Sequence, residues 1–100
     1  MDRVVSSDAA RINAYGREIR RLLVEGVAGK ALITGARDTG ERLAGNYVLD
    51  VDLLVTVEGV APYLTTLRTP IHGDDTAPYE AGCEYGVRVD PADRTNLAFA

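Results

Sequence analysis

Cysteine and histidine are almost absent from this sequence, and tryptophan is missing entirely. The single cysteine, Cys83, excludes an intramolecular disulfide and a cysteine-rich metal site. The single histidine, His72, excludes a metal site built on several histidines. No stretch approaches the roughly 20 apolar residues of a membrane-spanning helix, and no apolar secretory segment follows the charged N-terminus. We therefore expect a cytoplasmic protein with no membrane span and no cofactor.

Charge is unevenly distributed along the chain. The 100 residues carry a formal net charge of −4, and 46% of them are apolar, which is typical of a single globular domain. Residues 1–30 hold six basic and four acidic groups, a net of +2, whereas residues 31–100 hold five basic and eleven acidic groups, a net of −6. Because an acidic surface repels phosphate groups, the second segment disfavours nucleic-acid binding.

The first 26 residues carry the pattern of an amphipathic helix. Apolar residues recur there at three- and four-residue steps, which places them on one side of a helix. These residues, which we call the helix stripe, are Ile12, Tyr15, Ile19, Leu22 and Leu23. Residues 6–8 offer N-cap oxygens, so we expect a flexible segment over residues 1–7 and a helix over residues 8–26. Gly26 suits a left-handed residue at the C-terminal end of this helix.

Alternating apolar and polar residues dominate the rest of the chain. The alternation predicts five strands. Their ranges are Lys30–Arg37, Tyr47–Val57, Pro62–Thr69, Cys83–Asp90 and Thr95–Phe99. In the second and fourth strands, the odd-numbered side chains are apolar and are expected to face inward. Turn residues at Asp38-Thr39-Gly40 and a long irregular connection over residues 70–82 separate the strands.

One helix followed by five short antiparallel strands is an α+β pattern. The second strand would span roughly 36 Å, which is long enough for it to bend and pair with different neighbours along its length. We therefore expect an N-terminal amphipathic helix packed on a five-stranded antiparallel small barrel, OB-like or SH3-like, with its strands connected as a meander over residues 28–100.

Two segments of the chain have a familiar appearance. The first segment is Arg37-Asp38-Thr39-Gly40, and the second is Val87-Arg88-Val89-Asp90-Pro91-Ala92-Asp93. The order of these segments, with a long strand between them, resembles a small β-barrel domain of unknown function common in high-GC Gram-positive bacteria. The resemblance covers residues 28–100 and implies an actinobacterial origin and a barrel fold. It implies no mechanism, because that family has no established catalytic residues, and the helix lies outside the matched region.

A few acidic residues suggest an enzymatic alternative. Asp50 and Asp52 project from one face of the second strand, and paired carboxylates support acid–base chemistry or cation binding. With His72 and Asp74 they define a hypothetical metal-dependent hydrolase. The simpler interpretation is a solvated outer sheet face for the two strand aspartates, an exposed loop histidine, and a buried Cys83 that acts as a small apolar residue.

The helix stripe is the most informative functional feature. Its residues either pack on the chain's own barrel or pair with another chain, together with the flanking Arg17, Arg20 and Arg21. Because two heptads are too short for an isolated coiled coil, pairing would also need contacts from the barrel. We expect a non-enzymatic binding or assembly module, with a protein partner or a second copy in a homo-oligomer. One further alternative is a subunit of a larger cellular or viral assembly, in which the 69–82 connection contacts a neighbour.

Overall fold

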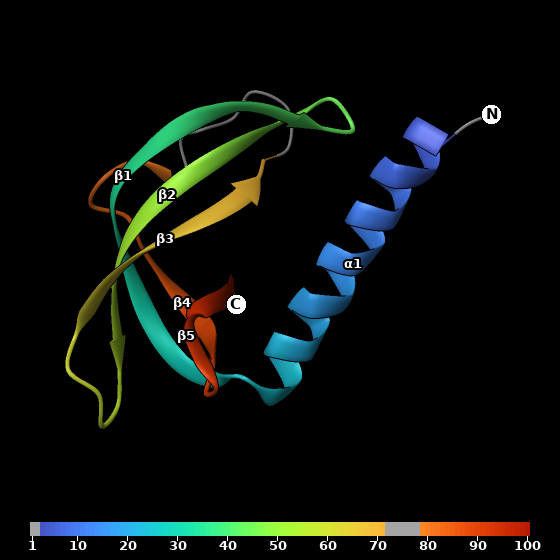
Figure 1. The fold of residues 1–100 in the computed structure, drawn as a ribbon. Coiled ribbons are helices and arrows are strands. Elements are labelled where there is room, and N and C mark those ends of the chain that lie inside the picture. Colours follow the sequence, from blue (N-terminus) through green and yellow to red (C-terminus); the bar gives the residue numbers. More distant parts are fainter. Residues whose placement is uncertain (1–2, 72–78) are drawn as a thin grey trace.

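The chain forms one α-helix followed by five β-strands (Figure 1). The computed structural model describes residues 3–71 and 79–100, with side chains described from residue 10 onward. The elements are helix α1 (Arg3–Glu25) and strands β1 (Val27–Leu43), β2 (Asn46–Val57), β3 (Tyr63–Pro70), β4 (Glu84–Asp90) and β5 (Asp93–Phe99). The expected fold class, an N-terminal helix packed on a five-stranded antiparallel, barrel-like sheet, is confirmed. Within the described ranges, no helix is long and apolar enough to cross a membrane.

Helix α1 begins earlier than expected. It starts at Arg3, so residues 3–7 are helical and residues 6–8 lie inside the helix instead of before it. No proline or glycine interrupts this stretch, and serine or aspartate inside a helix costs only a fraction of a kcal/mol. The helix ends at Glu25, one residue before the expected end at residue 26, and Gly26 does not take a left-handed conformation. Glycine is required there because a Cβ would lie only 2.9 Å from the Cβ of Arg88 in β4.

Strand β1 is the longest strand of the sheet at 17 residues, and it extends beyond the expected range of 30–37 on both sides. Its first part lies between β2 and β4, whereas its second part pairs with β2 alone. Asp38-Thr39-Gly40 does not reverse the chain, because the register with β2 shifts between Asp38 and Arg42 and the strand continues. The Asp38 carboxylate accepts a hydrogen bond from the N–H of Gly40, whose φ is +83°. Residues expected to form a turn thus form a bulge inside one strand.

The strand order is β3-β2-β1-β4-β5. The meander that we expected would place β4 beside β3, but β4 pairs with β1, because the long β1 offers a second edge. The order leaves β3 and β5 as the two edges of the sheet, and the bend of the sheet brings these edges toward each other (Figure 1). The Tyr63 hydroxyl of β3 donates a 2.8 Å hydrogen bond to the carbonyl oxygen of Arg94 in β5. We call the line between β3 and β5 the seam. Joining the edges there gives the circular order of an OB-type barrel.

The core lies inside the curved sheet, on the face predicted by the alternation. Six odd-numbered residues of β2 and β4 are at most 4% exposed, namely Leu49, Val51, Leu53, Val55, Val87 and Val89. Four aromatic residues with inward parity pack against this core as expected, namely Tyr47, Tyr63, Tyr85 and Phe99. The expected inward face of both strands is therefore confirmed.

Candidate functional site

The C-terminal half of α1 docks on the hairpin formed by β4 and β5. Leu22 anchors the helix, since its side chain is only 1% exposed. The Arg88 guanidinium of β4 donates a 3.3 Å hydrogen bond to the carbonyl oxygen of Gly26, directly after the helix. The helix C-terminus is thus held against β4 by an apolar side chain and by a charge-assisted hydrogen bond.

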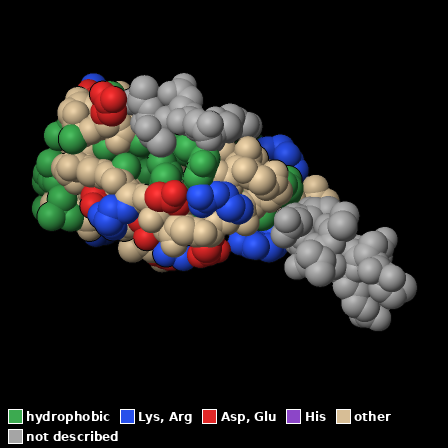
Figure 2. All heavy atoms as spheres, turned by 90° about the horizontal axis from the view of Figure 1, so that it is seen from above, with side chains coloured by type: hydrophobic (Ala, Val, Ile, Leu, Met, Phe, Trp, Pro, Cys, Tyr) green, Lys and Arg blue, Asp and Glu red, His purple; other side chains and the backbone are tan. Residues whose placement is uncertain are grey.

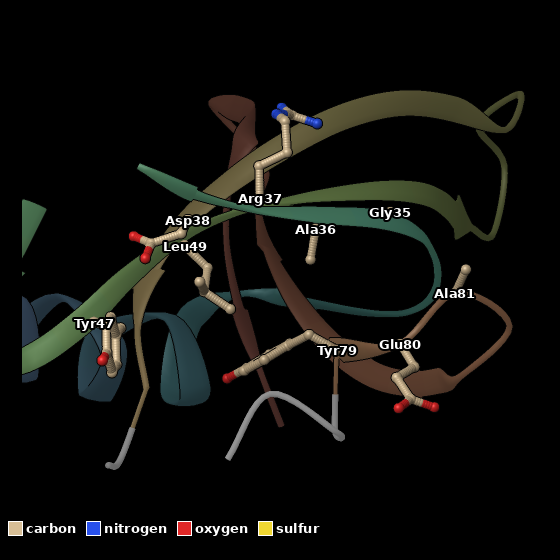
Figure 3. Close-up of a pocket in the computed structure, with 9 residues that line it drawn as sticks. All are labelled: Gly35, Ala36, Arg37, Asp38, Tyr47, Leu49, Tyr79, Glu80 and Ala81. Carbon is tan, nitrogen blue, oxygen red and sulfur yellow. The ribbon is translucent and has the colours of Figure 1, made fainter. Parts of the chain in front are cut away.

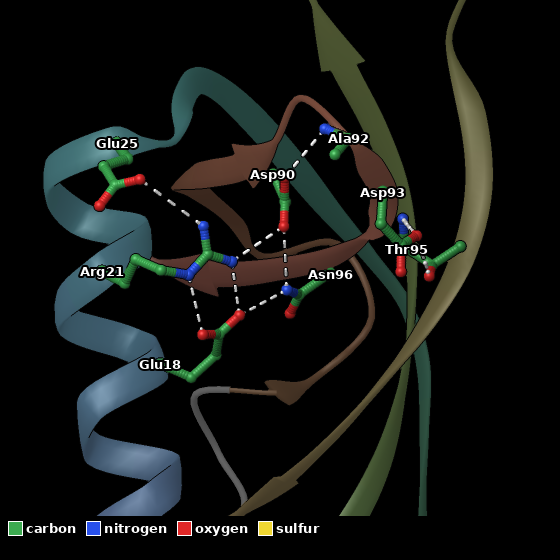
Figure 4. A network of polar contacts seen from close by, with 8 residues as sticks. All are labelled: Glu18, Arg21, Glu25, Asp90, Ala92, Asp93, Thr95 and Asn96. Carbon is green, nitrogen blue, oxygen red and sulfur yellow. Dashed lines mark hydrogen bonds and ion pairs between the residues drawn. The ribbon is translucent and has the colours of Figure 1, made fainter.

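A polar network fixes the same half of the helix to the sheet (Figure 4). The Arg21 guanidinium donates to both carboxylate oxygens of Glu18, at 2.9 and 2.6 Å. It also donates at 2.9 Å to the Asp90 carboxylate at the end of β4. The Asn96 amide of β5 donates at 2.7 Å to Glu18. Two helix residues and two sheet residues therefore share one network, which sets the rotation of α1 about its axis.

The network depends on ionised carboxylates. Hydrogen bonds from Arg21, and then from Asn96, lower the pKa of Glu18 from its ordinary value of 4.5 to about 2. The pKa of Asp90 is also lowered, chiefly by a hydrogen bond from the N–H of Ala92 and then by Arg21. The same two carboxylates raise the pKa of Arg21. All three side chains are therefore charged at neutral pH.

The middle of α1 crosses the seam. The hydroxyls of Tyr15 in α1 and Thr69 in β3 share a 2.9 Å hydrogen bond, and Thr69 is only 3% exposed. On the other side of the seam, Glu18 is bonded to Asn96 of β5. The helix therefore bridges the two sheet edges that do not pair with each other. Covering a sheet edge with a helix is one way in which proteins prevent uncontrolled strand pairing.

An apolar groove of about 530 Å³ lies between α1 and the sheet. The helix contributes Ile12, Tyr15 and Ile19 to its wall. The sheet and its connections contribute mainly apolar side chains, among them Leu43, Leu67, Ile71, Leu97, Ala98 and Phe99. The N-terminal half of the helix is thus held less closely to the sheet than the C-terminal half.

Much of the helix stripe remains exposed after docking. Ile12 is 43% exposed, Leu23 41%, and Val24, which lies beyond the stripe, 82%. The reason is the rotation of the helix, because the polar network turns Glu18 and Arg21 toward the sheet and moves one margin of the stripe toward solvent. The helix therefore presents an exposed apolar margin that its own sheet does not cover.

Two arginines stand beside this margin. Arg17, Arg20 and Val24 are spaced by three and four residues and so lie on neighbouring positions of one helix surface. Leu23, three residues after Arg20, lies at the margin of this surface. We call these four residues the exposed helix face. Arg17 and Arg20 are exposed and form no hydrogen bond or ion pair with another described residue. This face combines two apolar side chains with two free positive charges.

The eight residues predicted to bind a partner are thus divided by the structure. Leu22 and Arg21 are engaged by the chain's own sheet, and Tyr15 and Ile19 face the groove. Sequence reasoning missed Asp90 and Asn96, which position the helix. No local pattern reveals these two residues, because they lie 69 and 78 residues after their partners.

The aspartates of the hydrolase hypothesis are occupied by arginines. Asp50 accepts hydrogen bonds of 2.9 and 3.1 Å from Arg68 of β3, and Asp52 accepts a short bond and a 3.2 Å bond from Arg37 of β1. These bonds are the main cause of the lowered pKa of each aspartate. Figure 2 shows the resulting pattern of basic side chains next to acidic ones on this face. Both carboxylates are ionised and paired across strands, as an outer sheet face requires.

The other two members of that hypothesis, His72 and Asp74, fall outside the described residues, so the four residues are not seen together. Among the residues that are described, no group of three or more histidine, cysteine, aspartate or glutamate side chains is arranged to hold a metal ion. Cys83 is half-buried against the core, in keeping with its parity.

A second cavity, of about 570 Å³, lies between β1, β2 and the segment that precedes β4 (Figure 3). Tyr47 and Tyr79 form part of its wall, which also includes Asp38 and Glu80. Arg37 points away from the cavity, toward the face on which it binds Asp52. Among the described residues that line this cavity there is no serine, cysteine or histidine.

Comparison of the chain with protein-family models, with curated proteins and with solved structures finds no match. The resemblance of residues 28–100 to the small β-barrel family therefore stays a prediction, and the candidate site has to be interpreted from its own geometry.

Proposed function

We propose that the protein is a non-enzymatic binding and assembly module that contacts a protein partner through the exposed helix face. The observation that carries this proposal is that Leu23 is 41% and Val24 82% exposed on a helix that is already docked. A helix that served only to cover the seam would turn its apolar margin toward the sheet. Arg17 and Arg20 extend the exposed helix face with charges that have no described partner.

The partner follows from the chemistry of this face. An amphipathic helix is commonly recognised by an apolar groove that receives side chains spaced by three and four residues. Val24 would enter such a groove, Leu23 would contact its margin, and Arg17 and Arg20 would face acidic side chains at its rim. The fixed C-terminal half of α1 favours this contact, because the helix is ordered before binding and the partner does not have to order it.

The remaining parts of the proposal depend on the resemblance. A member of the small β-barrel family from an actinobacterium would be a module without catalytic residues, and a cytoplasmic location would agree with a partner inside the cell.

Site-specific photo-crosslinking in cells of the source organism tests the proposal. A photoreactive amino acid at Val24 should give a discrete protein adduct, and the double variant Arg17→Glu/Arg20→Glu should lose it. The control position is Glu58, an exposed residue of the turn between β2 and β3. Equal adducts at both positions, no adduct at Val24, or an adduct that persists in the double variant would each reject this function.

A further inference from the structure

The outer face of the sheet carries an unexpected row of leucines. Leu32 of β1 is the register partner of Leu54 in β2, and Leu54 is the register partner of Leu64 in β3. Directly opposed residues of antiparallel strands project to the same side. Three leucines therefore stand side by side across three strands, in what we call the leucine row.

The leucine row faces away from the core. Its neighbours along β1 and β2, namely Ala31, Ile33, Leu53 and Val55, are at most 1% exposed and point inward, so Leu32 and Leu54 point outward. Leu64, at the edge of the sheet, is 75% exposed. Figure 2 shows hydrophobic side chains gathered at the end of the molecule that lies opposite the N-terminus of the helix.

The row interrupts a polar surface. The other outward residues of β2 from position 50 to 56 are Asp50, Asp52 and Thr56. A single exposed leucine is ordinary on a protein surface, whereas three in register form a continuous apolar patch. Because Leu32 and Leu54 are each only partly exposed, the three side chains shield one another in the isolated chain.

Two opposite charges lie at one end of the leucine row. Glu84 of β4 is the register partner of Leu32, and Lys30 lies two residues before Leu32 on the same face. Both side chains are exposed, and neither forms an ion pair or hydrogen bond with another described residue. Asp52, on the other side of the row, is already neutralised by Arg37. The patch is thus locally neutral, although the chain as a whole carries a net charge of −4.

We propose that the leucine row is the contact surface for a second copy of this chain, related by a two-fold axis. A two-fold contact needs a self-complementary patch, on which each group meets its own counterpart or a complementary group. An axis that passes close to Leu54 sets leucines against leucines, and the Lys30 ammonium of each copy opposite the Glu84 carboxylate of the other. These two ion pairs between Lys30 of one copy and Glu84 of the other make the patch favour a second copy over an unrelated apolar surface.

This interface is separate from the one under "Proposed function". The leucine row lies on β1, β2 and β3, while the exposed helix face lies on α1, and the two share no residue. A dimer formed through the leucine row would carry two copies of the exposed helix face and would bind partners at two points. Failure of either interface can therefore be detected without reference to the other.

Zero-length crosslinking offers a direct test, because Lys30 is the only lysine in the chain. An equal mixture of isotope-labelled and unlabelled protein is treated with a carbodiimide, and the dimer band is digested for mass spectrometry. We expect a crosslink that joins the Lys30 peptide of one copy to the Glu84 peptide of the other, seen as a labelled–unlabelled hybrid. If the Lys30 crosslinks are only intramolecular, or join it to other carboxylates, the proposal is wrong.

Charge reversal provides the matched control. By light scattering over a concentration series, Lys30→Glu and Glu84→Lys should each weaken dimerisation about tenfold or more, because each change acts twice across a two-fold axis. An equimolar mixture of the two variants should dimerise again, and Leu64→Glu should not dimerise. Val24→Glu on the helix should leave the dimer unchanged. A wild type that stays monomeric, a mixture that does not recover, or a dimer lost only in Val24→Glu would overturn the proposal.

Discussion

Replacing Leu22 with alanine tests how α1 is held to the sheet. Leu22 is 1% exposed, so the change removes about three buried carbon groups, worth about 0.8 kcal/mol each. The cavity left behind adds to the loss, but the half-exposed neighbours Ile19 and Leu23 have room to move into it. We therefore expect the free energy of unfolding to fall by about 2–3 kcal/mol, near the lower end of the range for such changes.

Urea unfolding followed by far-ultraviolet circular dichroism measures this loss, and a thermal melt should show a midpoint lower by about 10–20 °C in a domain of this size. The matched control is Val24→Ala, two residues further along α1 on the opposite side of the helix, where the side chain is 82% exposed. It should change stability by less than about 0.5 kcal/mol. If Leu22→Ala and Val24→Ala lose equal amounts of stability, Leu22 does not anchor the helix and the docking described above is incorrect.

The remaining predictions concern the polar network and one glycine. The Glu18 carboxylate, whose pKa is about 2 in the folded protein and 4.5 ordinarily, stabilises the fold above about pH 4.5 and loses this contribution as the pH falls toward 2. Urea midpoints of Glu18→Gln should thus fall less steeply than those of the wild type through this window, and parallel curves would contradict the role of the network. A Cβ at Gly29 would lie 2.8 Å from the Thr56 carbonyl oxygen and 2.9 Å from a methyl group of Val57, so Gly29→Ala should destabilise by about 1–3 kcal/mol in urea. Gly86→Ala, with no atom within 4 Å of its Cβ, should change stability by less than about 0.5 kcal/mol, and equal losses would refute the packing argument.

The alternation of apolar and polar residues along β2 and β4 predicted which side chains face inward, because successive side chains of a strand point to opposite sides. A shift of the strand register by one residue would expose every apolar residue of the strand. Leu49, Val51, Val87 and Val89 are therefore buried as expected. The bulge at Asp38-Thr39-Gly40 was not predicted, because the same residues that form a tight turn also form a bulge, and only the partner strand distinguishes the two.

The rotation of α1 was also beyond prediction. The helix stripe predicts that the centre of the apolar side of the helix faces the sheet. The hydrogen bonds that join Glu18 and Arg21 to β4 and β5 instead place these two polar side chains against the sheet. Those bonds join residues that are far apart in the chain, and each carboxylate seen alone resembles an ordinary solvated group. The leucine row was hidden for the same reason, since Leu32, Leu54 and Leu64 become neighbours only through the register of three strands.

The bridge that α1 forms across the seam has a consequence for biosynthesis. Asn96 emerges from the ribosome 78 residues after Glu18, which it holds in place, and Asp90 emerges 69 residues after Arg21. Since synthesis proceeds from the N-terminus, helix α1 is made before β4 and β5, which form its docking surface. During translation the helix therefore lacks its complete docking surface until β5 has been made, so its native arrangement is completed late.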